Sequence, residues 1–155
     1  MKTLIAFYSR TGNNARIAKE LQDKINADIE EIVDKDKRKG PIGFFKSGFE
    51  AFRKKKAEIE PIKKNPSDYD LIVITAPLWV GTVPPAIRTY MEGNKFKKVA
   101  YLSVCGSGGN NEKALPNFEE LAGKKPIAYL MIKEKELEKK DYEPKLSEFA
   151  EKIKD

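Results

Sequence analysis

The sequence contains no histidine and only one cysteine, Cys105, among its 155 residues. Without histidine, the chain lacks the commonest general base and the imidazole of every Ser-His or Cys-His arrangement. A single cysteine cannot form an internal disulfide, and without histidine there is no conventional zinc cluster. Hydrolytic and zinc-dependent chemistry are therefore poor candidates for this chain.

Long apolar runs are also missing, since no run approaches the roughly 18 residues that a membrane span requires. The first apolar segment, Thr3 to Tyr8, is too short for a signal-peptide core and lacks a small-residue cleavage site. We therefore expect a cytoplasmic protein. The composition, 40% hydrophobic and 35% charged, predicts one globular domain over residues 1–155.

Positive charge is in excess, with 30 Lys and Arg against 24 Asp and Glu. A net charge of +6 suits an acidic protein partner or a membrane surface, and equally a merely solvated surface. Nucleic-acid binding is not favoured, because the basic runs at 35–39 and 53–56 belong to no recognisable nucleic-acid module.

Apolar strand-like segments alternate with segments of helical periodicity along the chain. The expected strands are Thr3–Tyr8, Asp28–Val33, Asp70–Pro77, Val99–Cys105 and Pro126–Ile132. The expected helices are 15–25, 84–91, 111–122 and 144–153. This alternation predicts an α/β fold with a doubly wound parallel sheet.

One connection, Lys35 to Pro66, is too long for an ordinary loop. Within it, Ile42, Phe45, Phe49 and Phe52 recur at helical spacing. This spacing favours a crossover helix that packs its phenylalanines on the sheet. A helix that lies on a membrane surface or docks a partner is the alternative.

Ligands of open α/β sheets bind outside the carboxyl ends of the strands, so the loops after the first, third and fourth strands are candidates. The first loop combines small hydroxyl and amide side chains with the start of a helix, which favours a phosphate. An N-cap and turn without a ligand would use the same residue types. Its candidate residues are Ser9, Arg10, Thr11, Gly12, Asn13 and Asn14.

The second loop contains the only tryptophan of the chain, Trp79. An aromatic ring on such a loop can cover one face of a flat heterocycle, although a tryptophan packed between loop and helix is the alternative. The candidate residues of this loop are Pro77, Leu78, Trp79, Val80, Gly81 and Thr82.

The third loop is rich in glycine, which lets backbone N–H groups approach a ring edge closely. Its first residue, Cys105, is either a reactive thiol or, more commonly for a free cysteine, a small apolar residue at a strand end. The candidate residues are Cys105, Gly106, Ser107, Gly108 and Gly109.

The segment Phe7 to Asn14, followed by Ala18 and Leu21, resembles the flavodoxin signature for the phosphate of flavin mononucleotide (FMN). That signature reads aromatic-x-Ser/Thr-x-Thr-Gly-Asn-Thr, so Asn14 departs from it, although its amide can still donate to phosphate. The resemblance implies a three-layer sandwich with a five-stranded parallel sheet of order 2-1-3-4-5. It also implies noncovalent FMN, with the peptides of Val80 to Thr82 beside flavin N5.

Many flavodoxins stack a tyrosine on the flavin from the third loop, and none occurs between Cys105 and Ala114. The second ring face is therefore either open or covered by Phe44, Phe45 or Phe49. The resemblance favours an electron carrier between redox partners, which the charge of this chain suggests are acidic. The alternative is an FMN-dependent NAD(P)H oxidoreductase acting on flavins or quinones, because an open flavin face suits hydride transfer.

Receiver domains share this sheet topology but need paired acidic residues after the first strand, where this chain has Phe7, Tyr8 and Ser9. We also expect Arg10, Arg88 and Lys46 to lie near the flavin rim, where their charge would favour the anionic reduced flavin.

Overall fold

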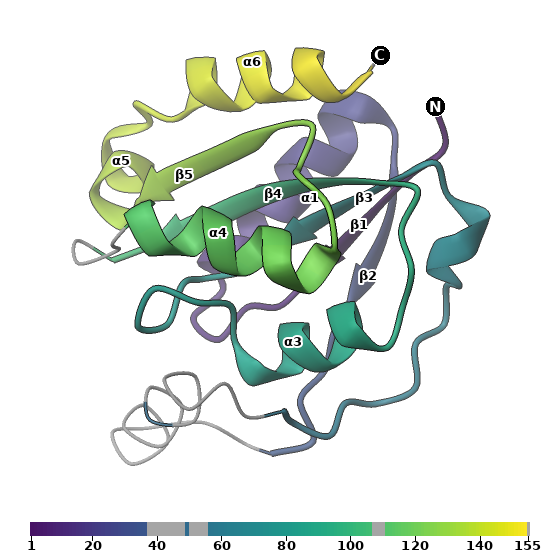
Figure 1. Cartoon of the computed structure of the whole chain (residues 1–155). Helices are drawn as coiled ribbons and strands as arrows, with labels where there is room; N and C mark the ends of the chain where they lie inside the picture. Colours follow the sequence, from purple (N-terminus) through teal and green to yellow (C-terminus); the bar gives the residue numbers. More distant parts are fainter. Residues whose placement is uncertain (37–48, 50–55, 107–110, 155) are drawn as a thin grey trace.

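The computed structural model describes residues 1–36, 49, 56–106 and 111–154. Five strands form one parallel sheet in the order β2-β1-β3-β4-β5 (Figure 1). They are β1 Thr3–Phe7, β2 Asp28–Glu31, β3 Leu71–Thr75, β4 Lys98–Cys105 and β5 Tyr129–Lys133. The predicted fold class and strand order are confirmed. Within the described ranges, no helix is both long and apolar enough to cross a membrane.

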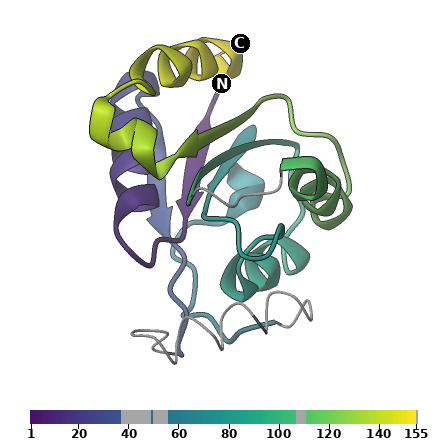
Figure 2. The ribbon, with the colours of Figure 1, turned by 90° about the vertical axis from the view of Figure 1, so that its left-hand side faces the viewer.

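Helices cover both faces of the sheet, as Figure 2 shows from the end of the sheet. The described helices are α1 Asn13–Ile25, the short 3-10 helix η1 Pro66–Asp68, α3 Pro85–Glu92, α4 Asn111–Ala122, α5 Glu134–Lys139 and α6 Glu143–Lys154. The three central strands, β1, β3 and β4, are almost entirely buried because each lies between two strands and under helices on both faces.

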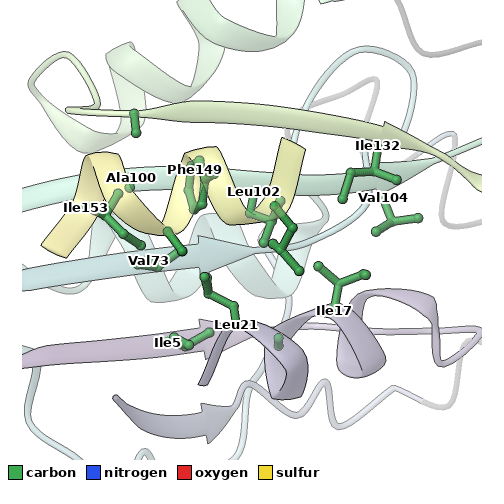
Figure 3. Packing of buried hydrophobic residues seen from close by; sticks show 14 of the residues in the cluster. Ile5, Ile17, Leu21, Val73, Ala100, Leu102, Val104, Ile132, Phe149 and Ile153 are labelled. Carbon is green, nitrogen blue, oxygen red and sulfur yellow. The ribbon is translucent and has the colours of Figure 1, made fainter. Parts of the chain in front are cut away.

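The core has two halves, one on each face of the sheet. On one face, Leu21 of α1 and Phe149 of α6 pack on Val73 and Leu102 of the sheet (Figure 3). On the other face, Tyr90 of α3 and Phe118 of α4 pack on the strands. Successive side chains of the buried strands point alternately into one half of the core and the other. A shift by one residue would exchange the two sets of side chains, so this alternation fixes the register of the sheet.

The largest differences from the predicted elements lie at the last strand and directly after it. The strand expected at Pro126–Ile132 begins only at Tyr129, and it is followed directly by α5, a helix that the sequence analysis did not predict. The N–H of Lys133 donates to the Glu136 carboxylate at 2.8 Å, which fixes the first turn of α5. This helix buries only Leu137, so it shows no apolar periodicity to read.

The long connection after β2 returns close to where it leaves the sheet. The N–H of Lys35 donates to the Glu58 carbonyl at 3.0 Å, and the N–H of Glu60 donates to the Val33 carbonyl at 2.9 Å. Most of the helix expected here, including Ile42, Phe45 and Phe52, lies outside the described residues, as do Phe44 and Lys46. Phe49 is described and is 55% exposed, more than a side chain packed on the sheet would be.

Candidate functional site

The loop after β1 presents the start of α1 without a side-chain cap. Gly12 is the N-cap residue, with a φ of 97° that favours glycine, and no described side chain caps the helix there. The N–H of Gly12 donates instead to the Ser9 hydroxyl at 3.0 Å. The first amides of a helix lack partners within it, so the amides that follow Gly12 are donors for an anion. Ser9 and Thr11 add hydroxyl groups at the same place.

Asn14 ties this loop to β4, which lies two strands away from β1 in the sheet. Its side chain is buried, its Nδ2 donates to the Val104 carbonyl at 3.0 Å, and its Oδ1 accepts from the Val104 N–H at 2.9 Å. The contact holds the start of α1 against the end of β4. One amide hydrogen of Asn14 remains for another acceptor. Its predicted role in phosphate binding stays a prediction, and its bracing role was not anticipated.

An acidic residue that the sequence analysis missed, Glu134, lies at the same place. The Asn13 Nδ2 donates to its Oε1 at 3.3 Å. A Cβ added to Gly106 would lie 3.9 Å from its Oε2. Glu134 therefore contacts the first loop and lies beside the start of the third. The sequence could have indicated Glu134, because this residue directly follows β5, whose carboxyl end lies at the same edge of the sheet.

The second loop contains a tight two-residue turn. Trp79 and Thr82 exchange backbone hydrogen bonds of 2.8 and 3.1 Å, and the two residues between them have φ values of 52° at Val80 and 73° at Gly81. Two successive left-handed residues define a type I′ turn. A left-handed β-branched residue is a strained exception, and Val80 is also 63% exposed at the tip. The turn therefore holds an unusual backbone conformation.

Trp79 joins the second loop to the first. Its ring lies edge-on to Tyr8, with centroids 5.5 Å apart and an interplanar angle of 83°. The Arg10 guanidinium carbon lies 5.9 Å from the Trp79 ring centroid, within cation–π range. Trp79 is only half-buried, so it combines packing against the protein with an open part of its surface.

The turn is held from two helices. The Asn117 side chain of α4 donates to the Gly81 carbonyl at 3.2 Å. From α3, the Arg88 Nη2 donates to the Thr82 hydroxyl at 3.0 Å. Arg88 is only 5% exposed, and burial lowers its pKa. It therefore lies buried behind the turn, and its predicted position near the flavin rim stays a prediction.

The third loop is described only in part. Ser107, Gly108 and Gly109 lie outside the described residues, while Gly106 is exposed at the end of β4. Burial is the main cause that raises the pKa of the Cys105 thiol, and Glu134 raises it further. Because a buried thiol with a raised pKa forms little thiolate, the arrangement favours the small strand-end residue over the reactive thiol.

Comparisons with known proteins assign the chain to a family. No curated protein matches the chain significantly in sequence. A flavoprotein from Lactobacillus acidophilus NCFM, solved in complex with FMN, is 23% identical with a TM-score of 0.68, over 89% of this chain and 97% of that one. A flavodoxin, WrbA-like protein from Agrobacterium tumefaciens is 13% identical with a TM-score of 0.60, over 97% and 95% of the two chains.

A flavodoxin from the domain Archaea is 14% identical with a TM-score of 0.56, and the match covers 100% of both chains. At these identities, likeness to solved structures establishes the fold alone. The family follows from a model described as flavodoxin, which matches residues 2–153, so this chain belongs to the flavodoxin family, as its sequence predicted.

Proposed function

We propose that this protein binds one FMN noncovalently and carries electrons between redox proteins. The observation that carries the proposal is the contact of Tyr8 with Trp79, 5.5 Å between ring centroids. This contact brings an uncapped helix start and a half-buried aromatic turn together at one edge of the sheet. Membership of the flavodoxin family and the FMN complex of the Lactobacillus relative support FMN as the cofactor.

The residues of the first loop fit a phosphate group. The hydroxyl groups of Ser9 and Thr11 and the first amides of α1 are all hydrogen-bond donors, as a dianion requires. Gly12 has open space where a side chain would begin, so a ligand can approach its backbone. We assign the phosphate to this loop, with Asn13 and Asn14 as further candidate donors.

The second loop fits a flat ring. Trp79 offers part of an aromatic face, and the backbone of Val80, Gly81 and Thr82 offers polar groups beside it. When bound, FMN supplies the redox chemistry, and the protein supplies binding, orientation and electrostatics. Pro77 and Leu78 lead into this turn, while Cys105 to Gly109 would border the ring from the third loop.

The charge near the turn supports an acidic redox partner. Arg10 lies beside Trp79. The Cβ of the exposed Lys113 lies 3.6 Å from where a Gly81 Cβ would be. Positive side chains next to the exposed tip of the turn steer acidic partners to it. The cytoplasmic location expected from the sequence stays a prediction.

A reductase that takes hydride from NAD(P)H is the second candidate. The exposure of Val80, 63%, favours it because the tip of the turn leaves room for a second molecule. Two measurements on the purified protein test both proposals. Flavin bands in the visible spectrum test FMN binding, and a protein that binds no flavin would contradict both functions. Steady oxidation of NADPH would favour the reductase, whereas rapid exchange of electrons with an acidic redox protein would favour the carrier.

A further inference from the structure

Arg88 is a buried cation whose ion pair with Glu92 is long and is shared with Lys56. Its nearest carboxylate among the described residues, Glu92, is 3.8 Å from Nη1 and lies 2.5 Å from Lys56. The Nε of Arg88 is buried and has no hydrogen-bond partner within the described part of the chain. A charge is costly to bury unless it is paired and hydrogen-bonded. The 3.8 Å pair with Glu92 therefore accounts for only part of the burial of this charge behind the turn.

The Arg88 guanidinium donates a hydrogen bond to the turn. Arg88 Nη2 donates to the Thr82 hydroxyl at 3.0 Å, and Thr82 is itself buried. Thr82 also closes the turn through two backbone hydrogen bonds to Trp79. The guanidinium thus holds the residue that closes the turn, whose tip carries the strained φ of Val80.

We propose that Arg88 is a positioning residue, which holds the Trp79–Thr82 turn through the Thr82 hydroxyl in the conformation that receives the flavin ring. The inference rests on the proposed function for its ligand, but not for the geometry of the turn. A residue that only stabilised α3 would need no contact with Thr82. The i,i+4 pairing with Glu92 serves that purpose and does not require the contact with Thr82.

The test uses two variants that remove opposite ends of the contact. Arg88→Met removes the cation without leaving a buried charge, and Thr82→Val removes the hydroxyl at nearly constant shape. Each should weaken FMN and riboflavin by the same factor, about tenfold, as loss of a charge-assisted hydrogen bond predicts. Because both act on the ring and not on the phosphate, the ratio of the two affinities should stay unchanged.

Two further measurements distinguish positioning from general destabilisation. One uses a variant of Thr82 that keeps the hydroxyl, and the other uses the double variant. Thr82→Ser should bind FMN within about twofold of the native protein. The double variant should be little worse than the weaker-binding single variant, since both remove one contact. The control is Tyr69→Phe, which removes a 2.7 Å hydrogen bond to Asp28 before β3 and should leave both flavin affinities unchanged.

Fluorescence of the flavin-free protein tests the turn directly, because Trp79 is the only tryptophan. Arg88→Met and Thr82→Val should shift its emission in the same direction, and Tyr69→Phe should not. Folded variants with native emission and native affinities, or losses that add fully in the double variant, would overturn the proposal. If the native protein binds neither flavin, the proposed function fails, and the emission of the flavin-free variants still decides whether Arg88 holds the turn.

Discussion

The Asn13 amide donates to the Glu134 carboxylate at 3.3 Å, so an acidic group contacts the loop to which we assign the phosphate. A carboxylate repels a phosphate dianion and competes with it for the Asn13 donor. Glu134→Gln should therefore tighten FMN binding severalfold, with little effect on riboflavin. Titration of the flavin-free protein with both ligands measures this, and a weaker FMN complex would show that Glu134 helps to hold the ligand.

The gain from Glu134→Gln should also depend on salt. Glu134 is exposed, so its repulsion is screened at high ionic strength, where the Debye length falls to about 3 Å at 1 M. The variant and the native protein should therefore converge in FMN affinity at 1 M salt. A matched control is Glu138→Gln, an exposed residue near the other end of α5, which should leave FMN affinity unchanged.

The Thr11 hydroxyl should contribute to FMN affinity but not to riboflavin affinity. A charge-assisted hydrogen bond is worth about 1.5–3 kcal/mol, so Thr11→Ala should weaken FMN binding roughly tenfold or more. Riboflavin, which lacks the phosphate, should bind the native protein much more weakly than FMN. Its affinity should be the same for the native protein and for Thr11→Ala. Equal affinity for FMN and riboflavin in the native protein would contradict our assignment of the phosphate to this loop.

Trp79 should quench the fluorescence of bound flavin, because it is only partly buried and the exposed part of its ring can meet the flavin. We expect strong quenching in the native complex and partial recovery in Trp79→Ala. The control is Tyr8→Phe, which keeps the edge-on ring contact with Trp79 and should keep the quenching. A bright native complex would mean that Trp79 serves only to pack the first two loops together.

Much of the site could be predicted from the sequence, because the rule for the carboxyl ends of parallel strands needs only the strand order. That rule brought Trp79 toward the loop that contains Arg10, and the structure joins them. It could have found Glu134 as well, had β5 been treated like β4. The hydrogen bonds of Asn14 to Val104 and of Arg88 to Thr82 could not be predicted, since each depends on the rotamer of a side chain and the close packing of two elements.

Alkaline pH should destabilise the fold through Tyr69. Burial, and then the hydrogen bond to Asp28, raise the pKa of Tyr69 to about 12. An unfolded tyrosine has a pKa of about 10, so the folded state favours the protonated phenol. That stabilisation is complete below about pH 10 and is lost as the pH rises toward 12. In urea unfolding, the stability difference between the native protein and Tyr69→Phe should shrink above pH 10, and a constant difference would contradict this.

Arg10 should raise the reduction potential of bound FMN, because it lies beside Trp79 and full reduction leaves an anionic flavin. A unit charge about 10 Å away in a near-aqueous dielectric contributes roughly 0.4–0.8 kcal/mol, or about 20–35 mV for one electron. Arg10→Glu changes the charge by two units, so at low salt the potential should fall by about twice that amount. Salt near 0.15 M, with a Debye length of about 8 Å, should remove much of the shift. Redox titration of the native protein, of Arg10→Glu and of the distant control Lys152→Glu on α6 measures this. A potential that moves equally in both variants would mean that total charge matters, and one that moves in neither would mean that backbone contacts of the turn set it.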